Sequence, residues 1–283
     1  MKIAGVVVLY NPNIEEVFKN TLSYIKFLKK LYIVDNSEYN NEKNIKNMYF
    51  NILNKVEYIW LGGNKGIAKA LNIGKNKAIK EKFKYLLTMD QDSFFDGNLI
   101  KLVRYIKSYS KQLENVAIIS PQYKLREKKY NLKTYNLTEE IELKKYVMTS
   151  GNFLNLELVK QIGDFNEEFF IDEVDNEYCY RINRRGYKIL MYKNCNLNHE
   201  LGNIKWYFFI KVTNHNYIRR YYITRNKLYM MKEFSEVRLK YFITFFYDLF
   251  KIIGFETDKR KKIISIIEGI SDFLENKSGE YKK

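Results

Sequence analysis

The chain has 283 residues, of which 46% are hydrophobic, so it is a globular protein long enough for one α/β domain and a smaller appendage. It contains two cysteines, Cys179 and Cys195, which argues against a disulfide scaffold and predicts a cytoplasmic location; no signal peptide is recognisable after Met1. The formal net charge of +16 fits nucleic acid, an anionic membrane surface or phosphate-bearing substrates as partners, and it equally fits a simple compositional bias.

Residues 1–120 alternate between two patterns. Apolar runs of strand length occur at Gly5–Tyr10, Leu31–Val34, Val56–Leu61, Tyr85–Met89 and Val116–Ser120. Helical spacing of apolar residues extends from Ile14 to Leu28 and recurs over Ile67–Ile79 and Leu99–Ile106, and a short helix is expected after the polar stretch Asn36–Asn47. Buried strands that alternate with helices predict a parallel sheet covered on both faces, with ligands bound beyond the carboxyl ends of its strands.

The second half of the chain is less regular. Its expected elements are a polar loop over Gln122–Glu140, a strand over Tyr146–Leu154, a helix over Val174–Arg185 that stops at Gly186, and a strand over Tyr187–Tyr192. From about Tyr217 the pattern is helical, and a boundary is expected within Gly202–Asn216.

One expected helix of the C-terminal region carries an apolar stripe from Leu239 to Ile253. Asp248 and Lys251 interrupt the stripe, so it is not a transmembrane span. The pattern favours a helix packed on the main domain, and a helix lying in a membrane interface is the alternative.

The sequence Asp90-Gln91-Asp92-Ser93 directly follows the strand expected at Tyr85–Met89. Two carboxylates at this spacing could hold a hard divalent cation such as Mg²⁺ or Mn²⁺, with substrate phosphates completing its coordination shell. A calcium-binding loop is excluded, because its fifth, sixth and twelfth positions would be Phe94, Phe95 and Lys101. The alternative to a metal site is an ordinary turn that begins at Asp92 or Ser93.

Two other motifs follow expected strands. Asp35, in Val34-Asp35-Asn36-Ser37, could accept hydrogen bonds from a nucleobase or ribose. Gly63, Asn64 and Gly66 precede the helix that begins at Ile67, so that backbone N–H groups could approach a phosphate. An ordinary turn explains either motif as well.

Acidic residues gather in the segment Phe170–Glu177. The four acids within six positions, Asp172, Glu173, Asp175 and Glu177, exceed what one helix N-terminus requires, and a carboxylate there could deprotonate an acceptor hydroxyl. His199, after the last expected strand, is a candidate metal or phosphate ligand, and His215 is interpreted as a plain polar residue.

Taken together and in this order, the motifs resemble those of the family 2 glycosyltransferases with the GT-A fold, and most closely the bacterial rhamnosyltransferase-like branch. The resemblance covers about residues 3–202. It rests on Val7–Pro12, Ile33–Ser37, Gly63–Ala68 with Asn72 and Gly74, Asp90–Ser93, Ser150–Asn152, and Phe170–Glu177 with Arg181 and Gly186, and more weakly on Tyr222, Arg225 and Asn226.

The resemblance implies an α/β fold of the GT-A type, a Rossmann-like mixed sheet with helices on both faces, followed by a helical C-terminal region. The expected catalytic domain is 1–204, with a nucleotide-binding half over about 1–120 and an acceptor half over about 121–204. The expected helical region is 205–283.

The resemblance also implies roles for individual residues. The expected nucleotide-binding residues are Tyr10, Asp35, Gly63, Asn64, Gly66 and Asp90. Asp92 would bind the Mn²⁺ or Mg²⁺ directly, with Asp90 and His199 beside it. Asp175 would be the catalytic base; because Val174 stands where many members have Glu, Asp172 is a second candidate.

The implied activity is an inverting, metal-dependent transfer of a sugar from a nucleotide diphosphate to an acceptor hydroxyl. L-rhamnose from dTDP-rhamnose is the first expectation for the donor, and a saccharide or lipid-linked glycan of cell-surface polysaccharide synthesis is the expected acceptor. The expected location is the cytoplasm, with peripheral attachment of the helical tail to the anionic inner face of the cell membrane.

Two alternatives to a glycosyltransferase stay open. A sugar-phosphate nucleotidyltransferase would carry a glycine-rich basic loop after the first strand, where this chain has Leu9–Asn13. A non-catalytic nucleic-acid-binding protein would need a basic face studded with aromatic residues. The basic residues are instead scattered along the sequence, so nucleic acid is not an expected partner.

Overall fold

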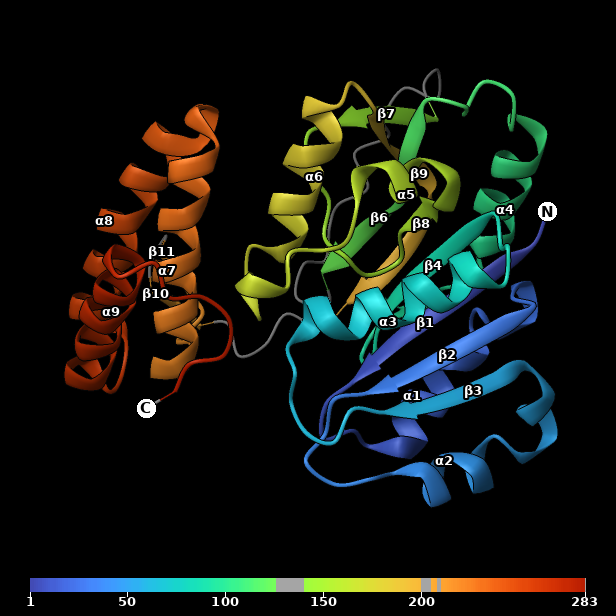
Figure 1. Cartoon of the computed structure of the whole chain (residues 1–283), viewed down its shortest axis with the longest axis horizontal. Coiled ribbons are helices and arrows are strands. Elements are labelled where there is room, and N and C mark those ends of the chain that lie inside the picture. The colour runs from blue at the N-terminus through green and yellow to red at the C-terminus, as the bar shows by residue number, and fades with distance from the viewer. Residues whose placement is uncertain (126–139, 200–204, 208–209, 283) are drawn as a thin grey trace. The chain divides into compact units, whose positions relative to one another are not determined.

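The computed structural model describes residues 1–125, 140–199, 205–207 and 210–282 (Figure 1). The chain divides into two compact units, which are described separately. The first consists of Met1–Phe165 and Tyr178–Glu200, and the second of Asn166–Glu177 and Leu201–Lys283. The acidic segment therefore belongs with the C-terminal helices, although in the sequence it interrupts the first unit.

The first unit is built on a sheet whose N-terminal half is parallel. Its strands β1 (Ile3–Leu9), β2 (Lys30–Asp35), β3 (Val56–Trp60) and β4 (Tyr85–Asp90) lie in the order β3-β2-β1-β4. The strand predictions for these four segments are confirmed. β1, β2 and β4 are almost wholly buried, as expected for strands covered on both faces.

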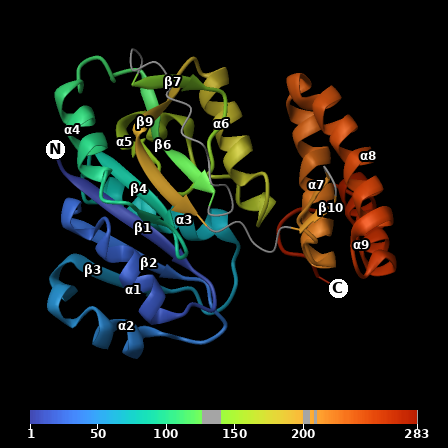
Figure 2. The same ribbon diagram turned by 180° about the vertical axis from the view of Figure 1, so that it is seen from behind.

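Helices cover both faces of this sheet. Three expected helices are confirmed as α1 (Ile14–Leu22), α3 (Ile67–Lys80) and α4 (Leu99–Ser108), although the first ends earlier than predicted and a short 3₁₀ turn, Ile25–Phe27, follows it. The short helix expected after the polar stretch Asn36–Asn47 lies mostly within that stretch, as α2 (Glu42–Met48). α3 covers the near face in Figure 1, and Figure 2 shows α1 and α4 on the opposite face. Successive residues of β1 face the two layers: Val6 lies against Gly74 of α3, and Gly5 lies against Leu28 on the other face.

The sheet continues beyond β4 with β8 (Phe153–Asn155), β6 (Val116–Leu125), β9 (Lys188–His199) and β5 (Phe94–Phe95), and β7 (Ile141–Lys144) also pairs with β9. β8 runs antiparallel to both β4 and β6, so the sheet is mixed. The family resemblance implies a mixed sheet, whereas the alternating strand and helix pattern predicted a parallel one. α5 (Leu156–Ile162) follows β8 directly.

The strand predicted over Tyr146–Leu154 is wrong. Only Phe153 and Leu154 belong to a strand, and residues 145–152 form a loop. The loop is hydrogen-bonded to Thr88 of β4, whose carbonyl accepts from Gly151 N and whose N–H donates to Asn152 O. Of the loop predicted over Gln122–Glu140, residues 122–125 belong to β6 and residues 126–139 lie outside the described part of the chain.

The second unit contains the predicted C-terminal helices α7 (Tyr217–Glu233), α8 (Arg238–Phe255) and α9 (Lys259–Leu274). α7 and α9 pack closely, because a Cβ atom at Gly269 would lie 2.8 Å from the carbonyl oxygen of Tyr221. A short antiparallel pair, β10 (Lys205–Tyr207) and β11 (Ile210–Val212), occupies part of the region where only a boundary was expected. α6 (Val174–Arg184) begins in the acidic segment. In the described residues, no helix is both long and apolar enough to cross a membrane.

Candidate active site

The carboxyl ends of the parallel strands bring the predicted nucleotide-binding residues to one edge of the sheet. Leu9 pairs with Asp35, Asp35 pairs with Trp60, and Val8 pairs with Asp90. The glycine-rich turn follows Trp60, and Tyr10 follows Leu9. In an open α/β sheet this edge is where ligands bind.

The turn Gly62–Gly66 leads into the N-terminus of α3. Gly62, Gly63 and Gly66 have φ angles of +70°, +117° and +84°, which other residues rarely adopt. Gly66 is the N-cap of α3 and has no side chain that could accept from the first N–H groups of the helix. Those N–H groups and the helix dipole favour an anion such as a phosphate.

Asn36 fixes the position of this turn. Its side chain donates to the carbonyl oxygen of Gly66 at 3.1 Å and accepts from Lys65 N–H at 2.7 Å, and it is buried. Asp35 of this motif was a predicted site residue, whereas Asn36 was not. The available signal was the amide itself, which can both donate and accept and so can hold a loop at two points.

Asp35 is fully buried, and its carboxylate is surrounded by donors from the protein. Ser37 N–H donates to Oδ1 at 2.9 Å, and Oδ2 accepts from Asn41 Nδ2 at 2.9 Å and Tyr58 OH at 2.6 Å. In this geometry Asp35 organises the chain after β2. Its expected contact with the nucleoside stays a prediction.

Gln91 connects the acidic motif to the end of β1. Its side chain accepts from Tyr10 N–H at 2.8 Å and donates to Tyr10 O at 3.2 Å, and Asn20 Nδ2 donates to Gln91 O at 3.0 Å. The side chain of Tyr10 is 46% exposed and so is accessible to a ligand. Gln91, which lies between Asp90 and Asp92 in the sequence, thus holds Tyr10 close to these two predicted metal ligands.

Asp90 and Asp92 lie at the end of β4, and both are half-buried. The loop that carries Ser150 supports them, because Ser150 Oγ accepts from Asp90 N–H at 3.1 Å. The described residues contain no group of three or more His, Cys, Asp or Glu side chains able to hold a metal ion. Carboxylate oxygens still suit Mg²⁺ or Mn²⁺, which bind through one or two carboxylates when substrate phosphates supply further oxygens. The donor set therefore fits a cation that binds together with a diphosphate.

His199 is the last residue of β9. β9 pairs with β5 through Asn198 and Phe94, so the backbone of His199 lies beside the segment that follows Asp92. Its side chain is outside the described structure, and its role as a metal ligand stays a prediction.

Asn72 and Gly74, two further residues of the resemblance, hold α3 in place. The Asn72 side chain donates to Phe165 O at 2.9 Å and accepts from Phe165 N–H at 2.8 Å. A Cβ atom at Gly74 would lie 2.4 Å from Val6 Cγ2, so the helix packs tightly on β1. Both contacts keep the N-terminus of α3 at the edge of the sheet.

The second unit carries the two candidate bases, in very different surroundings. Arg219 donates to Asp172, with Nη2 2.9 Å from Oδ1 and Nε 3.1 Å from Oδ2. Asp175, in the first turn of α6, accepts from Asn176 N–H at 2.8 Å. Burial and the nearby carboxylates of Glu173 and Asp172 raise the pKa of Asp175 to about 7.

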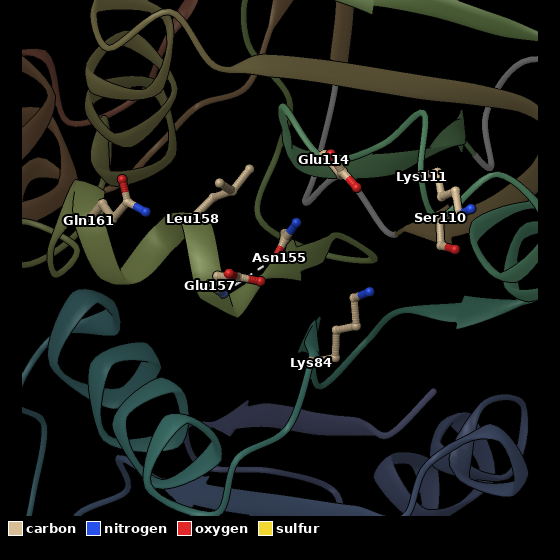
Figure 3. Close-up of a pocket in the computed structure, with 8 residues that line it drawn as sticks. All are labelled: Lys84, Ser110, Lys111, Glu114, Asn155, Glu157, Leu158 and Gln161. Atoms are coloured by element: carbon tan, nitrogen blue, oxygen red, sulfur yellow. Dashed lines mark hydrogen bonds between the residues drawn. The ribbon is translucent and has the colours of Figure 1, made fainter.

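A separate pocket of about 330 Å³ lies at the other end of β4 (Figure 3). It is lined by Lys84, Ser110, Lys111, Glu114, Asn155, Glu157, Leu158 and Gln161. Lys84 directly precedes β4, whereas Asp90 ends it, so this pocket is remote from the predicted donor site and includes none of the predicted site residues.

Comparisons with known proteins identify the family of the chain. The family model described as Glycosyl transferase family 2 matches residues 6–163. The chain is also similar to the dTDP-rhamnosyl transferase RfbF of Shigella flexneri, with 30% identity over 250 residues that cover 82% of this chain and 80% of RfbF.

Two solved structures share the fold. S. aureus TarS 1-349 in complex with UDP-GlcNAc superposes with a TM-score of 0.59 at 14% identity, over 97% of this chain and 81% of that one. GalNAc-T7 with UDP, GalNAc and Mn²⁺ gives a TM-score of 0.58 at 16% identity, over 71% of this chain and 44% of that one. With the mixed sheet and the C-terminal helices, these neighbours confirm the predicted GT-A-like fold.

Proposed function

This chain belongs to glycosyl transferase family 2 and so transfers a sugar from a nucleotide sugar, and from this premise we propose that it is an inverting, metal-dependent rhamnosyltransferase. The donor would be dTDP-rhamnose, and the acceptor a hydroxyl group of a saccharide or lipid-linked glycan in cell-surface polysaccharide synthesis. The proposed sugar rests on the similarity to RfbF, whose name specifies dTDP-rhamnose chemistry.

The observation that carries the donor site is the convergence of three features at one edge of the sheet. They are the exposed Tyr10, the glycine turn before α3 and the carboxylates of Asp90 and Asp92. Tyr10 would contact the nucleoside, and so would the turn with Gly63, Asn64 and Gly66. Asp90 would reach the ribose.

A divalent cation held by Asp92, with Asp90 and His199 nearby, would offset the negative charge that develops on the departing diphosphate. The protein would then need to fix that leaving group and exclude other orientations of the donor. Gln91 and Ser150 would contribute by holding the site in shape, because their hydrogen bonds join the ends of β1 and β4 and the loop of residues 149–152.

We assign the base to Asp175 in preference to Asp172. A pKa near 7 lets a carboxylate accept a proton at neutral pH while remaining a stronger base than an ordinary aspartate. Asp172, in contrast, is committed to Arg219 through both of its oxygens. Asp175 would remove the proton from the acceptor hydroxyl as its oxygen forms a bond to the anomeric carbon. The bond from that carbon to the diphosphate would break on the opposite side, which inverts the configuration.

We further propose that α8 attaches the protein to an anionic membrane surface. One face of the helix consists of apolar side chains that are each 52–73% exposed: Leu239, Phe242, Ile243, Phe246, Phe250 and Ile253. We call this face the α8 stripe. Arg238 and Lys240 are exposed beside it, and Asp248, the acidic residue of α8, forms ion pairs with Lys227 and Lys251. An apolar face with cationic edges matches a surface of anionic lipids.

The donor proposal is tested by thermal unfolding with dTDP, UDP and GDP, each with and without Mn²⁺ or Mg²⁺. A ligand at a hundredfold its Kd should stabilise the protein by about 2.7 kcal/mol, which shifts Tm by several degrees. We expect the largest shift with dTDP and metal, and its loss in Asp92→Ala. A metal-independent shift that survives in Asp92→Ala would contradict the metal role, and a preference for UDP or GDP would contradict dTDP-rhamnose as the donor.

A further inference from the structure

A strained turn precedes the acidic residues of the second unit. Phe170 has φ +52° and ψ −64°, and Ile171 N–H donates to Phe169 O at 2.5 Å, which together form a γ-turn of the rare positive-φ kind. Asp172 and Glu173 follow with φ angles of +62° and +63°. Backbone in these regions persists only where the surrounding structure holds it there.

Asn226 of α7 provides the main restraint on this turn. Its side-chain Nδ2 lies within hydrogen-bond distance of three carbonyl oxygens of the turn, Phe169 O at 2.7 Å, Ile171 O at 2.8 Å and Asp172 O at 3.0 Å, and its two hydrogens are shared among them. Asn226 is fully buried, and its Oδ1 accepts from Arg225 Nε at 3.2 Å. One amide thus satisfies carbonyl groups that the irregular backbone leaves outside any helix or strand.

Other side chains of the C-terminal helices hold the same segment. Phe170 stacks on Tyr222 with the ring centroids 5.2 Å apart, and Arg225 Nη2 donates to Glu168 O at 3.1 Å. Tyr241 of α8 donates to Glu173 Oε2 at 2.5 Å. Glu177 N–H donates to Glu173 O at 2.8 Å and closes the first turn of α6, in which Asp175 lies.

We propose that Asn226 is a positioning residue for Asp175, acting by fixing the strained turn from which α6 begins. The inference rests on the proposed role of Asp175 as the base. Two residues separate Asp172, whose carbonyl Asn226 binds, from Asp175, so the conformation of the turn sets the direction in which the Asp175 carboxylate points. The C-terminal helices are therefore part of the catalytic apparatus.

The test replaces Asn226 with Asp, which has the same size and shape but cannot donate to the three carbonyls. Hydrogen exchange of the amides in residues 168–175 should accelerate at least tenfold, while exchange in β1 and β4 stays unchanged. Release of dTDP from dTDP-rhamnose, with water as the acceptor, should slow about a hundredfold in kcat, because a small displacement of a catalytic group has effects of this size. The Kd for dTDP, which binds in the first unit, should change less than twofold.

The matched control is Met230→Ala, which opens a cavity at a fully buried position of α7 one turn beyond Asn226. It should lower Tm without changing kcat at a temperature where the protein is folded. A merely structural role for Asn226 would make the two variants behave alike, and that result would overturn the proposal.

Tyr241→Phe provides a second variant that keeps the ring and removes only the hydroxyl bound to Glu173. It should lower kcat more mildly, again with the affinity for dTDP retained, and a normal kcat in both Asn226→Asp and Tyr241→Phe would also overturn the proposal. The variant Asp175→Asn distinguishes failure of the proposed base role of Asp175 from failure of the positioning role of Asn226. Full activity in Asp175→Asn would remove the base assignment and the positioning role together, whereas an inactive Asp175→Asn with a normal Asn226→Asp would remove the positioning role alone.

Discussion

At the scale of single residues, three aspartates differ in their surroundings and therefore in their roles. Asp35 is enclosed by three donors and organises a turn, and Asp172 is bound by a guanidinium. Asp175 has the carboxylates of Glu173 and Asp172 nearby and a pKa of about 7. The surroundings of Asp175 therefore favour uptake of a proton at neutral pH.

The raised pKa of Asp175 predicts a stability change with pH in Asp175→Asn. The pKa of an aspartate in the unfolded chain is about 3.9, so the folded state binds the proton more tightly than the unfolded state does. The protein is therefore most stable, as far as this group is concerned, below about pH 3.9, and it loses stability as the pH rises to about 7, where the folded state must also accept the buried charge. Asn carries no charge at any pH. We therefore expect Asp175→Asn to unfold at a higher temperature than the wild type at pH 8 and at a similar temperature near pH 4.

The same variant should release dTDP from dTDP-rhamnose about 10²- to 10⁴-fold more slowly, the usual contribution of a general base. Asp258→Asn, at an exposed position of the second unit, is the control and should match the wild type in both measurements. Lower stability of Asp175→Asn at pH 8 would contradict the raised pKa, and an unchanged rate would contradict the catalytic role.

At the scale of secondary structure, the sequence predicted elements that bury a continuous apolar run and missed those that depend on distant partners. β1, β2 and β4 could be predicted because almost every residue in them is buried, and buried strands appear in the sequence as continuous apolar runs. The segment 146–152 has the side chains of a strand, yet its backbone bonds to Thr88 and its Gly151 adopts a φ angle of +82°. The partner that decides its conformation is about sixty positions away in the sequence.

The candidate site follows the same rule. Asp35, Asp90 and the glycine turn follow apolar strands, and their meeting at one edge could be predicted from strand order alone. Asn36 and Gln91 bind backbone atoms of segments remote in sequence, and Asn226 does the same for the acidic turn. An amide in a polar segment gives no sign of which carbonyl group it will reach, so these roles needed the structure.

Close packing of α3 on the sheet predicts opposite effects for two glycine substitutions. Gly74→Ala places a Cβ atom 2.4 Å from Val6 Cγ2, and this overpacking should lower the stability by about 1–3 kcal/mol. Gly254→Ala in α8 is the matched control, since a Cβ atom there meets nothing within 4 Å, and it should raise the stability by up to about 1 kcal/mol. Chemical denaturation measures both. Equal stability of the two variants would mean that α3 can move away from β1 without cost.

At the scale of the whole molecule, the expected catalytic domain 1–204 contains the segment 166–177 but not the C-terminal helices that hold this segment in place. Asn226 and Arg219 bind the turn that leads to Asp175, and Phe170 packs on Tyr222. We therefore expect a chain that ends at residue 204 to keep metal-dependent binding of dTDP and to lose release of dTDP from dTDP-rhamnose. Limited proteolysis should cut it within 166–177 and spare α3. A fully active shortened chain would show that residues 1–204 suffice.

The α8 stripe and the net charge of +16 predict attachment to anionic lipid vesicles. Phosphatidylglycerol vesicles should carry the full-length protein in a flotation assay, and uncharged phosphatidylcholine vesicles should carry much less. Added salt should weaken attachment, because it screens the cations beside the stripe. Replacing Phe246 and Phe250 together by Ser removes two apolar side chains from the lipid contact and should reduce binding about tenfold or more.

The control for the vesicle experiment is Phe50→Ser, which removes a 74%-exposed phenyl ring from the first unit and should leave binding unchanged. Equal attachment of the double variant and the wild type would show that the α8 stripe does not contact lipid. If the wild type instead formed a dimer in solution that the double variant could not form, a second copy of the chain would cover the stripe. The exposed aromatic side chains would then serve assembly, and the positive charge would have to be explained by the substrates alone.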